Sequence, residues 1–232
     1  MNIKLICTTA LKTSLDELLP QFERASGHKV EPSYGPSAQL TKRLAKGEAA
    51  DAVVLTGPGI EEMTKAGKVV AGSGANIASS ETMVAVKKGT PRPDISTVEK
   101  FKQAMLAAKS IAYSGPGAGA SGAHIAKIVQ ELGIAEAIKS KTVLGPGGPA
   151  GLIGHYLVRG EAEIGMQQDA ELMAVPGVDI LGPLPAGIGL VTEFAFGVHT
   201  GAKDGAAAKA LGEFMRTPAA RAVMKAKGLT PA

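Results

Sequence analysis

The sequence predicts an α/β protein with mostly parallel sheets and helices on both faces of each sheet. Short apolar runs of strand length alternate along the chain with longer segments in which apolar residues recur at helical spacing. The 30 Gly and 14 Pro lie in short groups between these segments, as expected for an ordered protein with many tight loops. A chain of 232 residues, 45% of them hydrophobic, can bury a substantial core as one large domain or as two lobes.

The predicted elements follow one another in alternating order. Strands are short runs rich in apolar and β-branched residues, and they lie at residues 3–7, 29–34, 52–55, 82–87, 110–113, 141–144, 162–167, 178–181 and 194–198. Helices are predicted at residues 14–25, 37–46, 59–66, 98–108, 121–132, 151–159, 170–173, 203–216 and 218–227. The first helix carries Leu15, Leu18, Leu19 and Phe22 at helical spacing. Because strand and helix alternate, most connections are crossovers between parallel strands.

Composition and charge exclude several classes of protein. The formal charge of +4 comes from 25 basic and 21 acidic residues that are scattered along the chain. Aromatic residues make up only 3% and Trp is absent, so we expect no nucleic-acid partner. No stretch approaches the roughly 20 apolar residues of a membrane helix. The opening "MNIKLICTTALKTSL" is too short for a secretory signal, so the sequence predicts a cytoplasmic protein if native as given and a periplasmic one if a signal was removed.

Metal and cofactor chemistry has no support in the residue spacing. His28, His124, His155, His199 and Cys7 show none of the close spacings of a zinc site, so we expect no metal and no cofactor. The lone cysteine cannot form an internal disulfide, and we expect a buried thiol.

The loops that follow the predicted strands share one composition. In open parallel sheets, ligands bind beyond the carboxyl ends of the strands, where loops lead into helices. These loops are small, hydroxylated and glycine-rich, with few charges, and read "TTALKT" (8–13), "GPSAQ" (35–39), "TGPG" (56–59), "SGPGAGASG" (114–122), "GPGGPAG" (145–151) and "QQDAE" (167–171). Backbone amides and hydroxyls at helix N-termini bind anions without any cationic side chain. The sequence therefore predicts a site for a compact oxyanion or carboxylate.

Gly117, Gly119 and Gly122 have the G-x-G-x-x-G spacing of a dinucleotide-binding loop. Such a fold places an acidic residue about twenty residues later, at the end of the next strand, but this chain reads "KTVLG" there. We therefore favour a loop whose glycines let the backbone approach a small anion, with Ser121 capping a helix that begins at Gly122. A plain connecting loop is the alternative.

The chain resembles the molybdate-binding type of solute-binding protein over nearly its whole length. The resemblance rests on "CTTALKTSLDELLPQFERASGHKVEPSYGPSAQLTKRLAKGEAADAVVLTG", on "ETMVAVKKG" and "GEAEIGMQQDAEL", and on the closing "FMRTPAARAVMKAKGLTPA". It implies the type 2 periplasmic binding protein fold, in which two α/β lobes close on a ligand in the cleft between them. The implied lobes are residues 1–80 plus 196–232 and residues 81–195, with strands crossing between the lobes near residues 81–86 and 193–198.

The resemblance also implies a set of ligand-binding residues. Thr9-Ala10 stands where these proteins usually have Ala-Ser, and Leu55-Thr56-Gly57 stands where they have Ser-Ala-Asp, whereas Ser37 is kept. Their tyrosine is absent near the strand end, where Gln167 and Gln168 stand instead. These differences leave the ligand open between molybdate and an organic carboxylate. The predicted ligand-binding residues are Thr8, Thr9, Ser37, Thr56, Ser114, Gly119, Ala120, Ser121, Gly122, Gly147, Gly148 and Gln168. As a transport receptor, the protein would be a monomer that binds a small anion and meets a membrane permease of an ABC-type importer.

The sequence is also similar to aconitate isomerase, an enzyme on the same fold that shifts a double bond by proton transfer. This resemblance leaves a cytoplasmic isomerase of unsaturated di- or tricarboxylates as the alternative function. Proton transfer needs an acid or base near the substrate carbon, and His124, close to the glycine loop, is the first candidate. His155 and Glu193 are weaker candidates, and Lys12 is a possible neutralising cation.

Overall fold

The computed structural model describes all 232 residues, which form two compact units. Unit 1 comprises Met1–Ser80 and Thr192–Ala232, and unit 2 comprises Glu81–Val191. The chain enters unit 2 within strand β4 (Ala75–Lys87) and leaves it at the start of strand β9 (Val191–Val198). The lobe boundaries and the cleft implied by the resemblance stay predictions.

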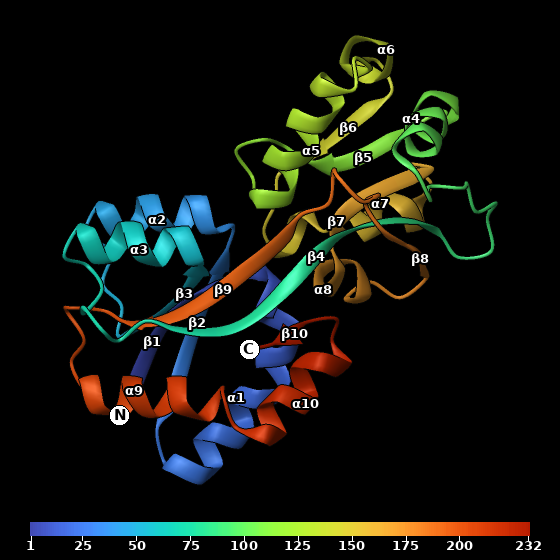
Figure 1. The fold of residues 1–232 in the computed structure, drawn as a ribbon. Coiled ribbons are helices and arrows are strands. Elements are labelled where there is room, and N and C mark those ends of the chain that lie inside the picture. Colours follow the sequence, from blue (N-terminus) through green and yellow to red (C-terminus); the bar gives the residue numbers. More distant parts are fainter. The chain divides into compact units, whose positions relative to one another are not determined.

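Unit 1 is built on a largely parallel sheet. Strand β1 (Asn2–Thr8) pairs in parallel with β2 (Lys29–Gly35) on one side and with β3 (Ala52–Thr56) on the other, and β9 runs antiparallel to β3. The short β10 (Thr230–Pro231) pairs with β4. Helices α2 (Ser37–Ala45) and α3 (Gly57–Lys65) lie on one side of this sheet; α1 (Lys12–Ser26), α9 (Gly205–Phe214) and α10 (Pro218–Ala226) lie on the other (Figure 1). One turn of 3-10 helix, Thr9–Leu11, joins β1 to α1.

Unit 2 has a second sheet, in the order β4, β7 (Ile164–Gln168), β5 (Ile111–Ser114) and β6 (Thr142–Gly145). Strands β7, β5 and β6 are parallel, whereas β4 is antiparallel to both β7 and β8 (Val178–Pro183). One core lies under α4 (Val98–Ala107), α5 (Ala120–Glu131) and α6 (Ala135–Lys139), and another lies under α7 (Ile153–Arg159) and α8 (Asp169–Met173). A 3-10 turn at Pro149–Gly151 precedes α7.

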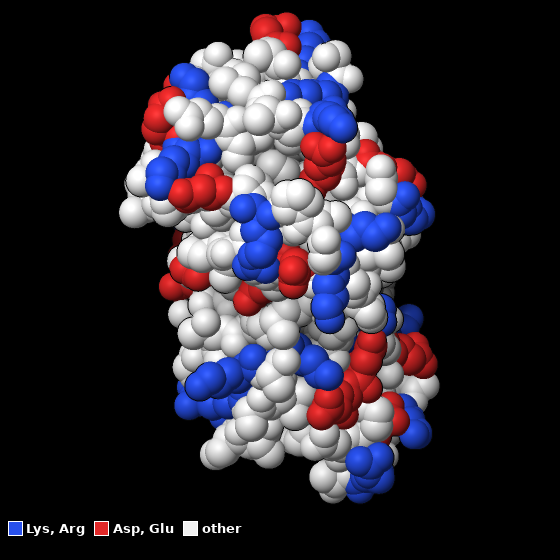
Figure 2. Space-filling view, turned by 90° about the vertical axis from the view of Figure 1, so that its right-hand side faces the viewer, with Lys and Arg blue, Asp and Glu red and all other residues white.

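The predicted α/β class is confirmed. Strand β9 begins at Val191 instead of residue 194, and three further features differ from the prediction. Strand β4 begins at Ala75 instead of residue 82, because Ile77 and Ala78 are buried and the strand pairs there with β10. Helix α6 and strand β10 are additional elements, too short to give a clear periodic pattern. None of the helices combines the length and the apolar composition that a membrane span requires. On the face drawn in Figure 2, basic and acidic side chains are interspersed, as expected from their scattering along the sequence.

Candidate functional site

In unit 1, the parallel register brings the carboxyl ends of three strands to one edge. Thr8 pairs with Gly35, and the preceding residue of β1 pairs with Val54 of β3. The loops that follow β1, β2 and β3 therefore lie together, and they carry the predicted ligand residues Thr8, Thr9, Ser37 and Thr56, which we call the unit 1 hydroxyl set.

The members of the unit 1 hydroxyl set have different partners. Ser37 is the first residue of α2, and its Oγ accepts a hydrogen bond of 3.1 Å from the Thr56 amide, which ties α2 to the end of β3. Thr9 Oγ1 is buried and has no hydrogen-bond partner in the protein. A buried hydroxyl without a partner is costly, so Thr9 is the member of this set with the strongest need for a ligand or a water molecule.

In unit 2, parallel pairing likewise brings the carboxyl ends of three strands, at Ser114, Gly145 and Gln168, to one edge of the sheet. Ser114 pairs with Gly145, and the residue before Ser114 pairs with Met166 of β7. The Gly115 amide donates to the Gly145 carbonyl at 2.9 Å, so the two glycine-rich loops of this unit run side by side. The carboxyl edge of the sheet therefore presents Ser114, both loops and Gln168 together.

Helix α5 begins at Ala120, and the prediction that Ser121 caps it is wrong. The residue before the helix is Gly119, whose carbonyl accepts from the Ala123 amide at 3.1 Å, and no side chain caps this end. Ser121 lies inside the first turn and is buried, so its hydroxyl is not at the capping position. The amides of Ala120, Ser121 and Gly122 have no acceptor in the protein, which is the arrangement of an anion site at a helix N-terminus.

The glycines of these loops have different structural roles. A Cβ atom on Gly122 would lie 2.2 Å from the Ser114 carbonyl oxygen, so this glycine is required for close packing of α5 on the end of β5. A Cβ atom on Gly117 would have no other atom within 4 Å. Gly147 and Gly148 are consecutive residues with φ of 73° and 72°, a left-handed conformation that favours glycine. The G-x-G-x-x-G spacing thus includes one glycine fixed by helix packing and needs no nucleotide to explain it.

The two glutamines at the end of β7 differ in their contacts. Gln167 Oε1 accepts a 2.7 Å hydrogen bond from the Ile153 amide and so caps α7. Gln168 is 5% exposed, and its Oε1 atom is buried without a partner. Of the two, Gln168 has the side chain free to bind a ligand.

Glu171, in the first turn of α8, is a further candidate that loop composition alone does not single out. Burial raises its pKa to about 7, although hydrogen bonds from the Gln167 side chain and the Gln168 backbone oppose the shift. Burial, and then the nearby Glu81, also raise the pKa of Asp169. A Glu three residues after the residue that precedes a helix has capping-box spacing, and this pattern could have drawn attention to it. A carboxyl group that titrates near neutrality suits proton transfer.

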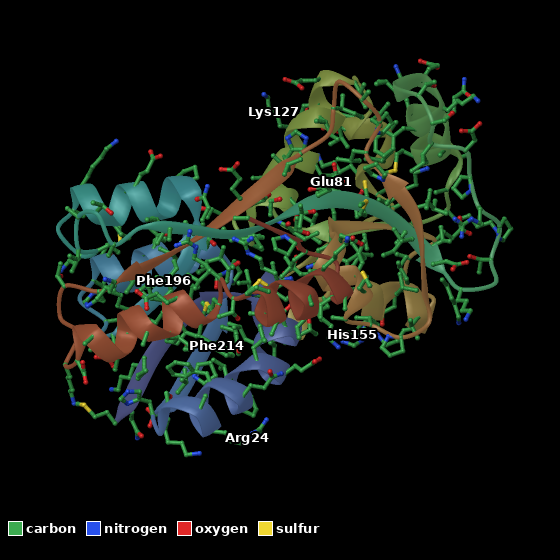
Figure 3. The ribbon with its side chains drawn as sticks, turned by 60° about the horizontal axis from the view of Figure 1, so that its bottom comes forward. Arg24, Glu81, Lys127, His155, Phe196 and Phe214 are labelled. Atoms are coloured by element: carbon green, nitrogen blue, oxygen red, sulfur yellow. The ribbon has the colours of Figure 1, made fainter.

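The residues proposed for the isomerase have the following positions. His124 is the fifth residue of α5, and its Nε2 lies 2.8 Å from the Ile188 carbonyl oxygen, to which it donates, so Nδ1 is the ring nitrogen left for other chemistry. His155 on α7 (Figure 3) and Glu193 on β9 are both exposed. Lys12 forms an ion pair of 2.6 Å with Asp16. Lys12 is therefore a partly exposed, paired cation.

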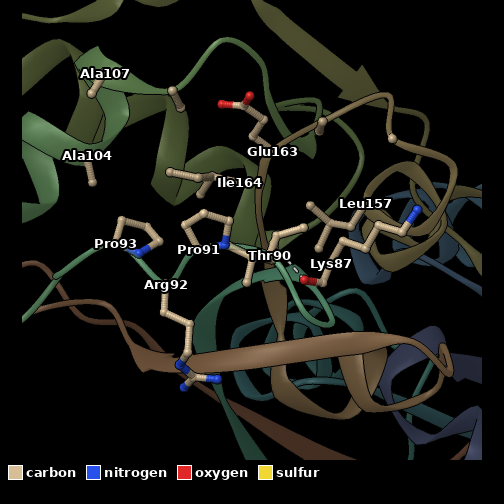
Figure 4. Close-up of a pocket in the computed structure, with 14 residues that line it drawn as sticks. Lys87, Thr90, Pro91, Arg92, Pro93, Ala104, Ala107, Leu157, Glu163 and Ile164 are labelled. Atoms are coloured by element: carbon tan, nitrogen blue, oxygen red, sulfur yellow. Dashed lines mark hydrogen bonds between the residues drawn. The ribbon is translucent and has the colours of Figure 1, made fainter.

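A separate cavity of about 460 Å³ lies at the opposite end of the unit 2 sheet (Figure 4). Its lining includes Ala104 of α4, Ala108 and Ile164 near the starts of β5 and β7, and the basic residues Lys87 and Arg92. None of the predicted ligand residues lines it.

Comparison with known proteins identifies the family. The profile of bacterial extracellular solute-binding proteins matches residues 3–230. An aconitate isomerase from Pseudomonas sp. is 31% identical over 236 aligned residues, covering 99% of this chain and 88% of that protein. The molybdate-binding protein ModA of Azotobacter vinelandii is 28% identical, with 92% and 84% covered. The solved periplasmic molybdate-binding protein of A. vinelandii has a TM-score of 0.80 at 20% identity over 98% of both chains, which confirms the predicted fold. The chain therefore belongs to the bacterial extracellular solute-binding protein family.

Proposed function

We propose that this protein binds a small oxyanion or carboxylate with the donors at the strand ends of both units. The observation that carries the proposal is the N-terminus of α5, where three amides without acceptors lie next to Ser114. Such amides and hydroxyls favour negative charge without a cationic side chain. The unpartnered Thr9 and Gln168 side chains add polar groups in each unit. In this proposal, the two units are the predicted lobes, and the variants described below test which of their donors the ligand engages.

The first test is thermal denaturation with a panel of anions. The names of the two curated relatives suggest molybdate, cis-aconitate and trans-aconitate as probes, and tungstate, sulfate and citrate extend the panel. An anion at 100 times its dissociation constant should stabilise the folded protein by about 2.7 kcal/mol. If no anion raises the melting temperature at millimolar concentration, the proposal fails.

Matched variants then test whether both units take part. Thr9→Val and Gln168→Ala each remove one polar group, and each should weaken binding of the anion found in the panel by about tenfold, the loss expected for one hydrogen bond to a charged group. Ser140→Ala, at an exposed position after α6, is the control and should bind as the wild type does. An effect of only one of the two variants would confine the site to one unit.

We further propose that the protein acts as a monomeric receptor that delivers its anion to a membrane permease. The family description and the resemblance to a molybdate-binding protein support this role. Fractionation of cells that express the native gene should place the protein outside the cytoplasm, and light scattering should give the mass of one chain. A purely cytoplasmic protein would contradict the receptor role and favour the second candidate.

The second candidate is an isomerase of unsaturated tricarboxylates. The full-length similarity to an aconitate isomerase favours it, and unit 2 also carries an imidazole, His124, and a carboxyl group with a raised pKa, Glu171. The protein is incubated with cis- or trans-aconitate in deuterated water, and NMR follows exchange and the isomer ratio. Protein-dependent exchange that is lost in Glu171→Gln would assign proton transfer to that carboxyl, and loss in His124→Ala would assign it to the imidazole. Binding without exchange in the wild type would exclude this candidate.

A further inference from the structure

Thr82 of β4 lies directly opposite Gln168, the last residue of β7, in the antiparallel pair of the two strands. Directly paired residues of antiparallel strands project their side chains on the same face of the sheet, with Cβ atoms about 5 Å apart. Thr82 is 1% exposed and Gln168 is 5% exposed. The hydroxyl and the amide are therefore enclosed neighbours at the carboxyl edge of unit 2, beside the proposed anion site.

Both side chains lack partners, although the backbone around them is fixed. The Thr82 amide donates to the Leu190 carbonyl at 2.9 Å, and the Thr82 carbonyl accepts from the Leu184 amide at 3.1 Å. Thr82 Oγ1 and Gln168 Oε1 are nevertheless buried without a hydrogen bond. One is a hydroxyl donor and the other is a carbonyl acceptor, so a hydrogen bond between them would satisfy both.

The orientation of the Gln168 amide matters for an anion. Its Nε2 end donates hydrogen bonds, whereas its Oε1 end repels negative charge. Nε2 is not among the enclosed, unpartnered atoms. The neighbouring Gln167 is oriented by a protein donor, the Ile153 amide, at 2.7 Å. For Gln168, the corresponding protein donor is the buried hydroxyl of Thr82 on the paired strand.

We propose that Thr82 is a positioning residue: its hydroxyl donates to Gln168 Oε1 and so turns Gln168 Nε2 toward the bound anion. This inference rests on the proposed function, since it assigns the ligand contact to Gln168. Without the hydroxyl, the amide can rotate by half a turn and present its oxygen to the site. Thr82 itself makes no contact with the ligand in this arrangement.

The binding test uses isothermal titration calorimetry with cis-aconitate and with molybdate. Thr82→Val, which keeps the shape but lacks the hydroxyl, should weaken binding of the recognised anion about tenfold, and Thr82→Ser should stay within about threefold of the wild type. In the Gln168→Ala background, Thr82→Val should have no further effect, because it acts through the amide. Thr142→Val, on β6 of the same unit, controls for loss of a strand threonine hydroxyl, here one bonded to Ile138. The inference is overturned if Thr82→Val binds with wild-type affinity. It is also overturned if Thr82→Val weakens binding further in the Gln168→Ala background.

A second measurement needs no ligand. In NMR spectra of the ligand-free protein, the Gln168 side-chain amide protons should show weak cross-relaxation with the Thr82 methyl group, because the carbonyl end faces Thr82. In Thr82→Val, cross-relaxation with the valine methyl groups should be stronger, because the amide rotates. Equal intensities in the two proteins would refute the inference. If the wild type binds none of the anions, the proposed function fails, while this spectrum still decides how the amide is oriented.

Discussion

Replacement of Gly122 by alanine tests whether the glycine-rich loop is shaped by helix packing. The added Cβ would lie 2.2 Å from the Ser114 carbonyl oxygen and 2.7 Å from that of Gly115. Both are backbone atoms at the end of β5, so no side-chain rotation relieves the overlap. Helix α5 would have to move outward by about 1 Å, since ordinary contacts begin near 3.4 Å. The helix carries Ile125 and Ile128 into the core, which would lose contacts as it moves.

We expect Gly122→Ala to lower the free energy of unfolding by about 3 kcal/mol, at the upper end for overpacking of a dense core. For a chain of this size, about 3 kcal/mol corresponds to a melting temperature lower by roughly 6–12 °C. Gly117→Ala is the matched control, because its Cβ meets no atom within 4 Å and its φ is not positive. It should change stability by less than about 0.5 kcal/mol.

Urea denaturation of the two variants and the wild type, followed by circular dichroism, measures these differences. Gly122→Ala should also weaken anion binding at temperatures where it is folded, because the free amides of α5 move away from Ser114. If Gly122→Ala is as stable as the wild type, or if Gly117→Ala is equally destabilised, close packing of helix on strand does not explain the motif.

Three further predictions concern the single side chains Glu171, Cys7 and Ser37. The pKa of Glu171 is raised from 4.5 to about 7, so between these pH values the folded state holds a proton that the unfolded state has lost. The free energy of unfolding should therefore fall as pH rises across this window, by at most about 3 kcal/mol. Urea denaturation at several pH values should show a smaller fall for Glu171→Gln. Burial raises the pKa of the Cys7 thiol, so a disulfide reagent should modify it only after denaturation, and rapid reaction of the native protein would contradict its burial. Ser37→Ala removes the acceptor of the Thr56 amide and should cost about 1 kcal/mol in the same denaturation assay, whereas an unchanged midpoint would show that water replaces the bond.

Much of the fold could be predicted because its causes are local in sequence. Leu15, Leu18 and Phe22 are buried on one face of α1 as their spacing indicates. The loops after β1, β2 and β3 meet at one edge because parallel pairing aligns strand ends, which is a rule independent of side-chain detail. Strand order and the excess length of β4 were not predictable in this way, since they depend on pairing with β10 from the far end of the chain.

The sequence by itself determined the α/β class, the family resemblance and the hydroxyl-rich character of the strand-end loops. Only the tertiary structure decided that Ser121 does not cap α5, that His124 Nε2 is held by the Ile188 carbonyl, and that Thr82 faces Gln168. Periodicity and loop composition act over a few residues, so a sequence records them directly. Which polar atom is buried, and which distant group can satisfy it, depends on contacts between segments that only packing brings together.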